Sequence, residues 1–141
     1  MDVILKLVRN IITIDGPSGV GKGTLAFSLA EKLGWNVLDS GLIYRLIGFL
    51  SLKEKLETPH EIIICINNSK IKLLTNLKKR ICEIELDDKV LGKELRNENV
   101  ASKASELAKD SEIRNAIMKI QRNAYKKEKG LIADGRDMGT V

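Results

Sequence analysis

A short run near the N-terminus has the residue types and spacing needed to bind phosphate. Residues 11–14 predict a buried strand, three glycines follow within six positions, and residues 25–33 predict a helix. The glycines let successive backbone N–H groups converge on an anion, while Lys22 and the helix start add positive charge. The run departs from the general motif because Gly23 follows the lysine and the hydroxyl comes at Thr24. This stretch therefore predicts a phosphate-binding loop.

Polar residues also follow two further predicted strands. Residues 36–39 end at Asp39, which Ser40 and Gly41 follow, and residues 131–134 are followed by Gly-Arg-Asp-Met-Gly-Thr. From the residues alone, the first cluster suits a helix cap and a ligand site equally well. The carboxyl ends of parallel strands meet at one edge of a sheet, which is where such sheets bind ligands. We expect Tyr44 and Arg45, one helical turn later, to reach the same crevice.

Three arginines are spaced so that each comes from a different element: Arg45, Arg114 and Arg136. A guanidinium grips phosphate oxygens through two parallel hydrogen bonds, so separate arginines suit a second phosphate. Phosphoryl transfer between two bound phosphates depends on positioning and charge neutralisation more than on a strong base. The pattern favours that chemistry, and we identify no catalytic base.

The positioning elements follow from hydrophobic periodicity. Apolar spacing predicts helices over 42–50, 99–108 and 113–124, and alternating charges predict a small antiparallel insertion between 67 and 91. The apolar run 61–66 fits helix or strand, and the preceding proline favours helix. Residues 1–10 are either an extension or the lead-in to the first strand. Strand, loop, helix and strand in succession predict an α/β fold with a parallel sheet and right-handed crossovers.

Composition limits the other function classes. The 141 residues are 43% hydrophobic and 30% charged, as in an ordinary globular domain, and the net charge is +5. The lysines are dispersed and aromatic residues make up 4%, so we expect no nucleic-acid partner. No apolar run is long enough to span a membrane and no signal-peptide pattern is present, so we expect a cytoplasmic protein without membrane partners. Cys65 and Cys82 lack metal-ligand spacing and are expected to be reduced, and we expect no protein metal site.

Three segments in this order resemble bacterial cytidylate kinases, which belong to the P-loop nucleoside monophosphate kinases. The segments are 16–24 (GPSGVGKGT), 38–45 (LDSGLIYR) and 132–141 (IADGRDMGTV), and the likeness runs from about Ile11 to Val141. The resemblance implies a three-layer P-loop kinase fold with an incomplete parallel core and a CMP-side antiparallel insertion. Glycine after the lysine is usual in this family, which implies that Mg²⁺ is held mainly through waters and nucleotide phosphates.

The resemblance also implies residue roles in transferring phosphate from ATP to CMP or dCMP. Lys22 and Arg136 would be catalytic, Lys22 by bridging the phosphates and Arg136 by holding the acceptor phosphate. The ATP phosphates would lie on Gly16, Pro17, Ser18, Gly19, Val20, Gly21, Lys22, Gly23 and Thr24. The CMP site would contain Ser40, Tyr44, Arg45, Ser105, Arg114, Arg136 and Asp137. Without the resemblance, Ser105 and Arg114 are better interpreted as solvent-facing helix residues.

Family members continue past the point that matches Val141, so the resemblance implies a C-terminal truncation that lacks the lid and the remaining core. We divide the chain into a P-loop part over 1–66, the insertion over 67–109, and a return to the core over 110–141. We expect weak or no kinase activity from a chain of this length, and a monomer if complete or self-association if not. Two alternatives remain: a nucleotide-binding remnant without catalysis, and a kinase for another small acceptor such as a different nucleoside monophosphate.

Overall fold

The structure is a computed structural model that describes residues 4–8, 10–16, 21–127 and 130–135. The described elements, in chain order, are β1 (Ile4–Val8), β2 (Ile11–Asp15), α1 (Lys22–Leu33), β3 (Asn36–Asp39), α2 (Ser40–Lys53), α3 (Pro59–Asn67), β4 (Ile71–Asn76), β5 (Ile81–Leu86), β6 (Lys89–Leu91), the 3₁₀ helix η1 (Lys93–Arg96), α4 (Glu98–Leu107), α5 (Ser111–Lys127) and β7 (Leu131–Gly135).

The chain divides into two compact units. The first unit contains Met1–Ser40, Leu74–Cys82 and Gln121–Val141, and the second contains Gly41–Leu73 and Glu83–Ile120. Both α5 and the hairpin of β4 and β5 therefore contribute residues to each unit. The sequence instead predicts boundaries after residues 66 and 109, where its pattern changes. That division stays a prediction.

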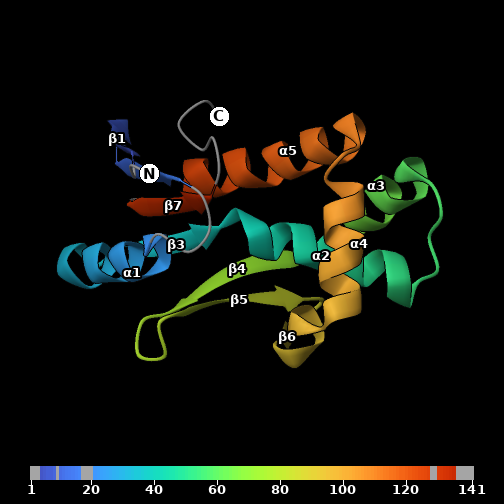
Figure 1. The fold of residues 1–141 in the computed structure, drawn as a ribbon, viewed down its shortest axis with the longest axis horizontal. Helices are drawn as coiled ribbons and strands as arrows, with labels where there is room; N and C mark the ends of the chain where they lie inside the picture. The colour runs from blue at the N-terminus through green and yellow to red at the C-terminus, as the bar shows by residue number, and fades with distance from the viewer. Residues whose placement is uncertain (1–3, 9, 17–20, 128–129, 136–141) are drawn as a thin grey trace. The chain divides into compact units, whose positions relative to one another are not determined.

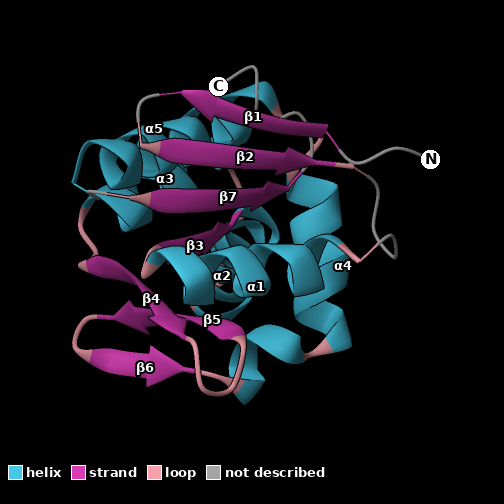
Figure 2. Ribbon diagram, turned by 90° about the vertical axis from the view of Figure 1, so that its left-hand side faces the viewer, coloured by secondary structure: helices cyan, strands magenta, loops and turns pink. Residues whose placement is uncertain are grey.

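The first unit is built on a four-stranded sheet in the order β1-β2-β7-β3 (Figure 2). Strand β7 runs parallel to both of its neighbours, and Ile132 pairs with Ile12 on one side and Val37 on the other. The predicted α/β class, with three parallel strands and connecting helices, is confirmed. Strand β7 is apolar because it lies between two other strands and Leu131, Ile132 and Ala133 are all buried.

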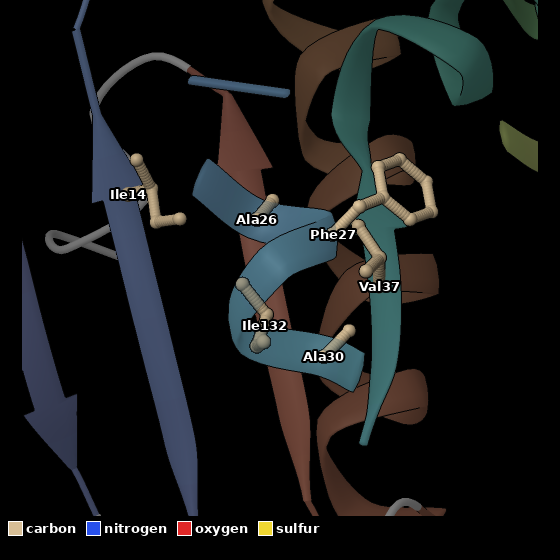
Figure 3. Packing of buried hydrophobic residues seen from close by; sticks show 6 residues of the cluster. All are labelled: Ile14, Ala26, Phe27, Ala30, Val37 and Ile132. Carbon is tan, nitrogen blue, oxygen red and sulfur yellow. The ribbon is translucent and has the colours of Figure 1, made fainter. Parts of the chain in front are cut away.

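Helix α1 packs against β2, β7 and β3, and its apolar side forms the core of the first unit. Ala26, Phe27 and Ala30 from this helix meet Ile14, Val37 and Ile132 from the three strands (Figure 3). The two alanines are fully buried, so the helix backbone approaches the sheet closely. Gly34 ends the helix with a φ of 69°, as its position in the sequence predicts.

The second unit packs helices on one another beside an antiparallel sheet in the order β4-β5-β6. Helices α2 and α4 cross each other (Figure 1). They approach closely at Gly48, where an added Cβ would lie 2.8 Å from the carbonyl oxygen of Val100. Thr58 caps α3 by accepting a hydrogen bond from the N–H of Glu61 at 3.2 Å. The apolar run 61–66 is therefore a helix, as the preceding proline indicated, and the antiparallel insertion is also confirmed.

The N-terminal residues differ from both sequence-based alternatives. Residues 4–8 form a separate strand, β1, that pairs antiparallel with β2 and places Val8 opposite Ile11. Only two residues separate the paired positions, so the chain reverses in a tight hairpin. Strand β1 thereby occupies the edge of β2 that faces away from β7. Separately, no helix among the described residues is long and apolar enough to cross a membrane.

Candidate functional site

The phosphate-binding run begins where β2 ends. Gly21 precedes α1 with a φ of 82°, and, its chain neighbours aside, no atom of the described residues lies within 4 Å of the position a Cβ would take there. The left-handed backbone, not crowding, therefore selects glycine at this position. Lys22 is the first residue of the helix, and Gly23 and Thr24 are exposed in its first turn. Pro17, Ser18, Gly19 and Val20 lie outside the described residues.

Lys22 makes the central contact of this site. Its Nζ atom lies 3.6 Å from Oδ1 of Asp134, at the end of β7, and the two side chains are 12% and 17% exposed. This separation is an ion-pair distance but is too long for a hydrogen bond. Oδ1 of Asp134 is buried and has no hydrogen-bond partner among the described residues. The pair therefore has an acceptor oxygen available beside a lysine ammonium.

Burial raises the pKa of Asp134 above its ordinary value. The positive charge of Lys22 opposes this shift, and the carboxylate of Asp39 adds to it. The parallel register explains the second carboxylate, since Asp39 pairs with Asp134 across β3 and β7. Two acidic side chains and one lysine thus meet at the carboxyl edge of the sheet.

The strand ends predicted to meet do so in the first unit. Asp134 pairs with Ile14 of β2 as well as with Asp39 of β3, so the ends of all three parallel strands lie at one edge. Ser40, directly after β3, is 8% exposed, and its hydroxyl donates to the carbonyl oxygen of Asp134 at 3.5 Å. The sheet edge is thus confirmed, while the ligand role of Ser40 stays a prediction.

The second unit holds four of the predicted CMP residues. Arg45 Nη1 donates to the carbonyl oxygen of Leu95 at 3.4 Å. Burial raises the pKa of Tyr44, and the positive charge of Arg114 opposes the shift. Ser105 is exposed on α4, and its role beside Arg114 stays a prediction.

Arg114 also has a structural partner. Its Nη1 donates at 3.0 Å to the carbonyl oxygen of Ala108, the residue that caps the C-terminus of α4. A cation at the end of a helix satisfies an unpaired carbonyl and complements the helix dipole. The interpretation of Arg114 as a helix residue at the protein surface is thus supported by geometry, and its role toward cytosine stays a prediction.

Two predicted site residues, Arg136 and Asp137, lie outside the described residues. For Asp134, in contrast, the sequence pattern predicts only a place at a polar strand end and no role. The available signal was an acidic side chain that closes an otherwise apolar strand, a placement that costs free energy unless a partner lies nearby. Among the described residues, no group of three or more His, Cys, Asp or Glu side chains is arranged to hold a metal ion.

Comparisons with known proteins identify the family of this chain. The family described as cytidylate kinase matches residues 12–141. A cytidylate kinase from Pasteurella multocida is 43% identical over 93% of this chain, and one from Aeromonas salmonicida is 40% identical over the same share. A cytidylate kinase from Sodalis glossinidius is 41% identical over 97% of the chain. The chain covers 56% to 60% of the length of these relatives.

Proposed function

Because this chain belongs to the cytidylate kinase family, we propose that it binds ATP at the loop before α1 and transfers the terminal phosphate to CMP or dCMP. The observation that carries the proposal is the Lys22–Asp134 contact at the carboxyl edge of the parallel sheet. A mostly buried ammonium at the start of a helix is well placed to bind a polyanion. The family match over residues 12–141 supports the choice of nucleotides.

Lys22 serves the transfer by neutralising charge on the phosphates. The charge of a transferred phosphoryl group is spread over its oxygens, so fixed positive groups lower the barrier without acting as acid or base. Asp134 holds the ammonium from the side of the sheet, at 3.6 Å, and so restricts where it can lie. The exposed Thr24 and the first-turn N–H groups of α1 would be the other phosphate ligands from the described residues of the loop.

Mg²⁺ is the metal that nucleotide kinases generally use, and the residues present fit it in a limited way. Asp134 offers a buried oxygen without a hydrogen-bond partner among the described residues, which is the kind of hard donor that Mg²⁺ prefers. When bound, the ion would screen the charge of the phosphates. Since no larger acidic cluster is present in the described part of the chain, waters and phosphates would supply the other ligands.

On the acceptor side, the proposal assigns CMP to Ser40, Tyr44, Arg45, Ser105, Arg114, Arg136 and Asp137. The chemistry suits cytosine, which presents an amino donor to a carboxylate and acceptors to a guanidinium or hydroxyl. Tyr44 and Arg114 support this assignment because both belong to the second unit and the charge of Arg114 acts on the Tyr44 hydroxyl by lowering its pKa. The proposal makes the protein a transferase that acts on small nucleotides in the cytoplasm.

The test is ATP-dependent phosphorylation of CMP by the purified 141-residue protein, with dCMP, UMP and AMP as alternative acceptors. We expect Lys22→Ala to lower turnover by about 100-fold or more, as when a group that stabilises transition-state charge is removed. Lys32→Ala is the matched control, because Lys32 is exposed in the last turn of the same helix. Equal turnover in both variants would contradict the role of Lys22.

Binding is measured separately, by calorimetric titration with ATP and with CMP. CMP and ATP binding without turnover would replace the kinase proposal by nucleotide binding without catalysis. Preferred turnover of UMP or AMP would replace CMP by another acceptor. A folded protein that binds neither nucleotide would overturn the proposal, and far-UV circular dichroism establishes the folded state.

A further inference from the structure

The outer edge of β3 is closed by a side chain instead of another strand. Strand β3 stands at the end of the four-stranded sheet, where backbone groups have no neighbouring strand to bond. The N–H of Val37 donates to Oγ1 of Thr75 at 2.9 Å, and the same hydroxyl donates to the carbonyl oxygen of Val37 at 3.1 Å. One threonine hydroxyl thus satisfies both backbone groups of a residue that is 4% exposed.

Cys82 lies against the next part of the same edge. Its thiol donates to the carbonyl oxygen of Val37 at 3.5 Å. Burial raises the pKa of this thiol to about 12, and the charges of Asp39 and Asp134 add to the shift. The backbone of Asp39 acts in the opposite direction and lowers the pKa. Thr75 and Cys82 together therefore cover the backbone groups of Val37 on this edge.

Both side chains come from a segment that is fixed at other points of the first unit. Leu77 and Cys82 pack against the hydrophobic cluster of α1 and the sheet. At the turn between β4 and β5, the guanidinium of Arg80 donates to both carboxylate oxygens of Glu31 on α1, at 3.0 and 3.1 Å. The 74–82 segment thus contacts α1 and the hydrophobic cluster as well as the edge of β3, so it can restrain that strand.

We propose that Thr75 and Cys82 are positioning residues for the acceptor side of the nucleotide site. By closing the edge of β3 they fix its carboxyl end, where Asp39 and Ser40 lie beside Asp134. Val37 is two residues before Asp39, a distance of about 7 Å along a strand, so a shift at Val37 moves the site. This inference rests on the proposed function, because it gives the restrained strand end a role in nucleotide binding.

The first experiment measures how well the edge is closed, by the rate at which Cys82 reacts with a disulfide reagent. The protein has two cysteines, so Cys65→Ser leaves Cys82 as the only thiol. Because the thiolate is the reactive form, burial keeps the rate low in this parent. We expect Thr75→Val, which keeps the shape and removes the hydroxyl, to raise the rate by about 10-fold or more. Thr75→Ser retains the hydroxyl and is expected to restore the parent rate.

A matched control separates local opening from general loss of stability. Thr58→Val removes another threonine hydroxyl that accepts a backbone hydrogen bond, at the start of α3 in the second unit. We expect it to leave the reactivity of Cys82 close to that of the parent. If Thr58→Val and Thr75→Val raise the rate equally, Thr75 has no particular role at the edge of β3 and the inference is wrong.

The second experiment asks whether the edge matters for the site, by titrating the same proteins with CMP and with ATP. A positioning role predicts that Thr75→Val weakens CMP binding by about 10-fold, changes ATP binding by less than about 2-fold, and is rescued by Thr75→Ser. Equal losses for both nucleotides, or no loss for CMP, would overturn it. If the parent itself binds no CMP, the proposed function fails and this role fails with it, while the thiol rates still show whether Thr75 closes the edge.

Discussion

The two compact units hold their charged side chains in different ways. In the first unit, Lys22 and Asp134 face each other at 3.6 Å, and both side chains are mostly buried. In the second unit, Arg45 and Arg114 donate to the backbone carbonyls of Leu95 and Ala108. An ion pair that contains a carboxylate responds to pH, because the carboxylate can be protonated, whereas a backbone carbonyl keeps its partial charge at every pH.

The difference suggests separate origins of binding energy. In the first unit the cation and its counter-charge are already in place, so a phosphate would meet a preorganised site. If Arg45 and Arg114 of the second unit bind a nucleotide as proposed, the nucleotide would compete with carbonyl oxygens for the guanidinium groups or share their remaining N–H groups. We therefore expect pH and charge substitutions to act mainly on the first unit, and helix-packing substitutions to act on both.

The largest effects on stability are expected at two glycines, one in each unit. A Cβ at Gly48 would lie 2.8 Å from a backbone oxygen, and one at Gly130 would lie 2.4 Å from the ring of Trp35. We expect each Gly→Ala substitution to lower the free energy of unfolding by about 1–3 kcal/mol. Gly48→Ala should have the larger effect, because a helix backbone must move instead of a ring.

Urea unfolding followed by far-UV circular dichroism measures both variants. The fluorescence of Trp35, the single tryptophan, gives a second readout for Gly130→Ala. Gly23→Ala is the control, since nothing lies within 4 Å of the position its Cβ would take and alanine favours a helix. A control that destabilises as much as Gly48→Ala would show that the close approach of α2 and α4 is not the cause.

The next effect is a pH dependence confined to Asp134. Its pKa is raised in the folded protein above the ordinary value of 3.8, so the folded state binds this proton more tightly than the unfolded state does. The contribution of Asp134 to stability therefore increases as the pH falls from neutral through the folded pKa toward 3.8, and is lost as the pH rises. Asp134→Asn removes this titrating carboxyl group and with it the pH dependence.

We expect the unfolding free energy of the wild-type protein, minus that of Asp134→Asn, to decrease between about pH 4 and pH 7. Parallel urea-unfolding series at several pH values measure this difference. Asp88→Asn serves as the control, because Asp88 has a 74% exposed side chain. A difference that stays constant over the range would contradict the raised pKa of Asp134.

A smaller effect is expected from Arg114 in the second unit. Arg114→Gln removes the cation that donates to the C-terminal cap of α4, which should lower stability by about 0.3–1 kcal/mol. Lys119→Gln removes an exposed charge from α5, the helix that also carries Arg114, and is the matched control. Chemical unfolding of the two variants decides the point, and equal stability would show that the contact with Ala108 contributes nothing.

The smallest effect is expected from the exposed pair of Arg80 and Glu31 in the first unit. The side chains are 43% and 44% exposed, so water and salt screen the interaction. We expect Arg80→Ala to lower stability only slightly, and the loss to shrink in high salt. Unfolding at low and high salt, with Lys78→Ala as the control in the same turn, tests this. A large loss that persists in salt would mean that the pair anchors the hairpin more strongly than an exposed ion pair does.

The sequence predicted much of the fold because its local patterns agree with the sheet and helices. The apolar residues around Ile132 predicted a buried strand, and the leucines and alanines after Thr24 predicted α1. The alternating charges around Ile84 predicted antiparallel strands. The sequence does not predict the strand within residues 1–10, because the pattern there fits either an extension or the lead-in to the first strand. Its pairing with β2 depends on the chain reversal between the two strands.

What the sequence determined by itself is most of the helices and strands and the glycine-rich run before α1, because these depend on neighbours within a few positions. Only the tertiary structure placed Asp134 beside Lys22, which lies far earlier in the chain, and the hydroxyl of Thr75 on the edge of β3. Such contacts depend on strand order and register. A pairing shifted by one residue would turn Asp134 and Val37 to other faces, and no local pattern fixes that choice.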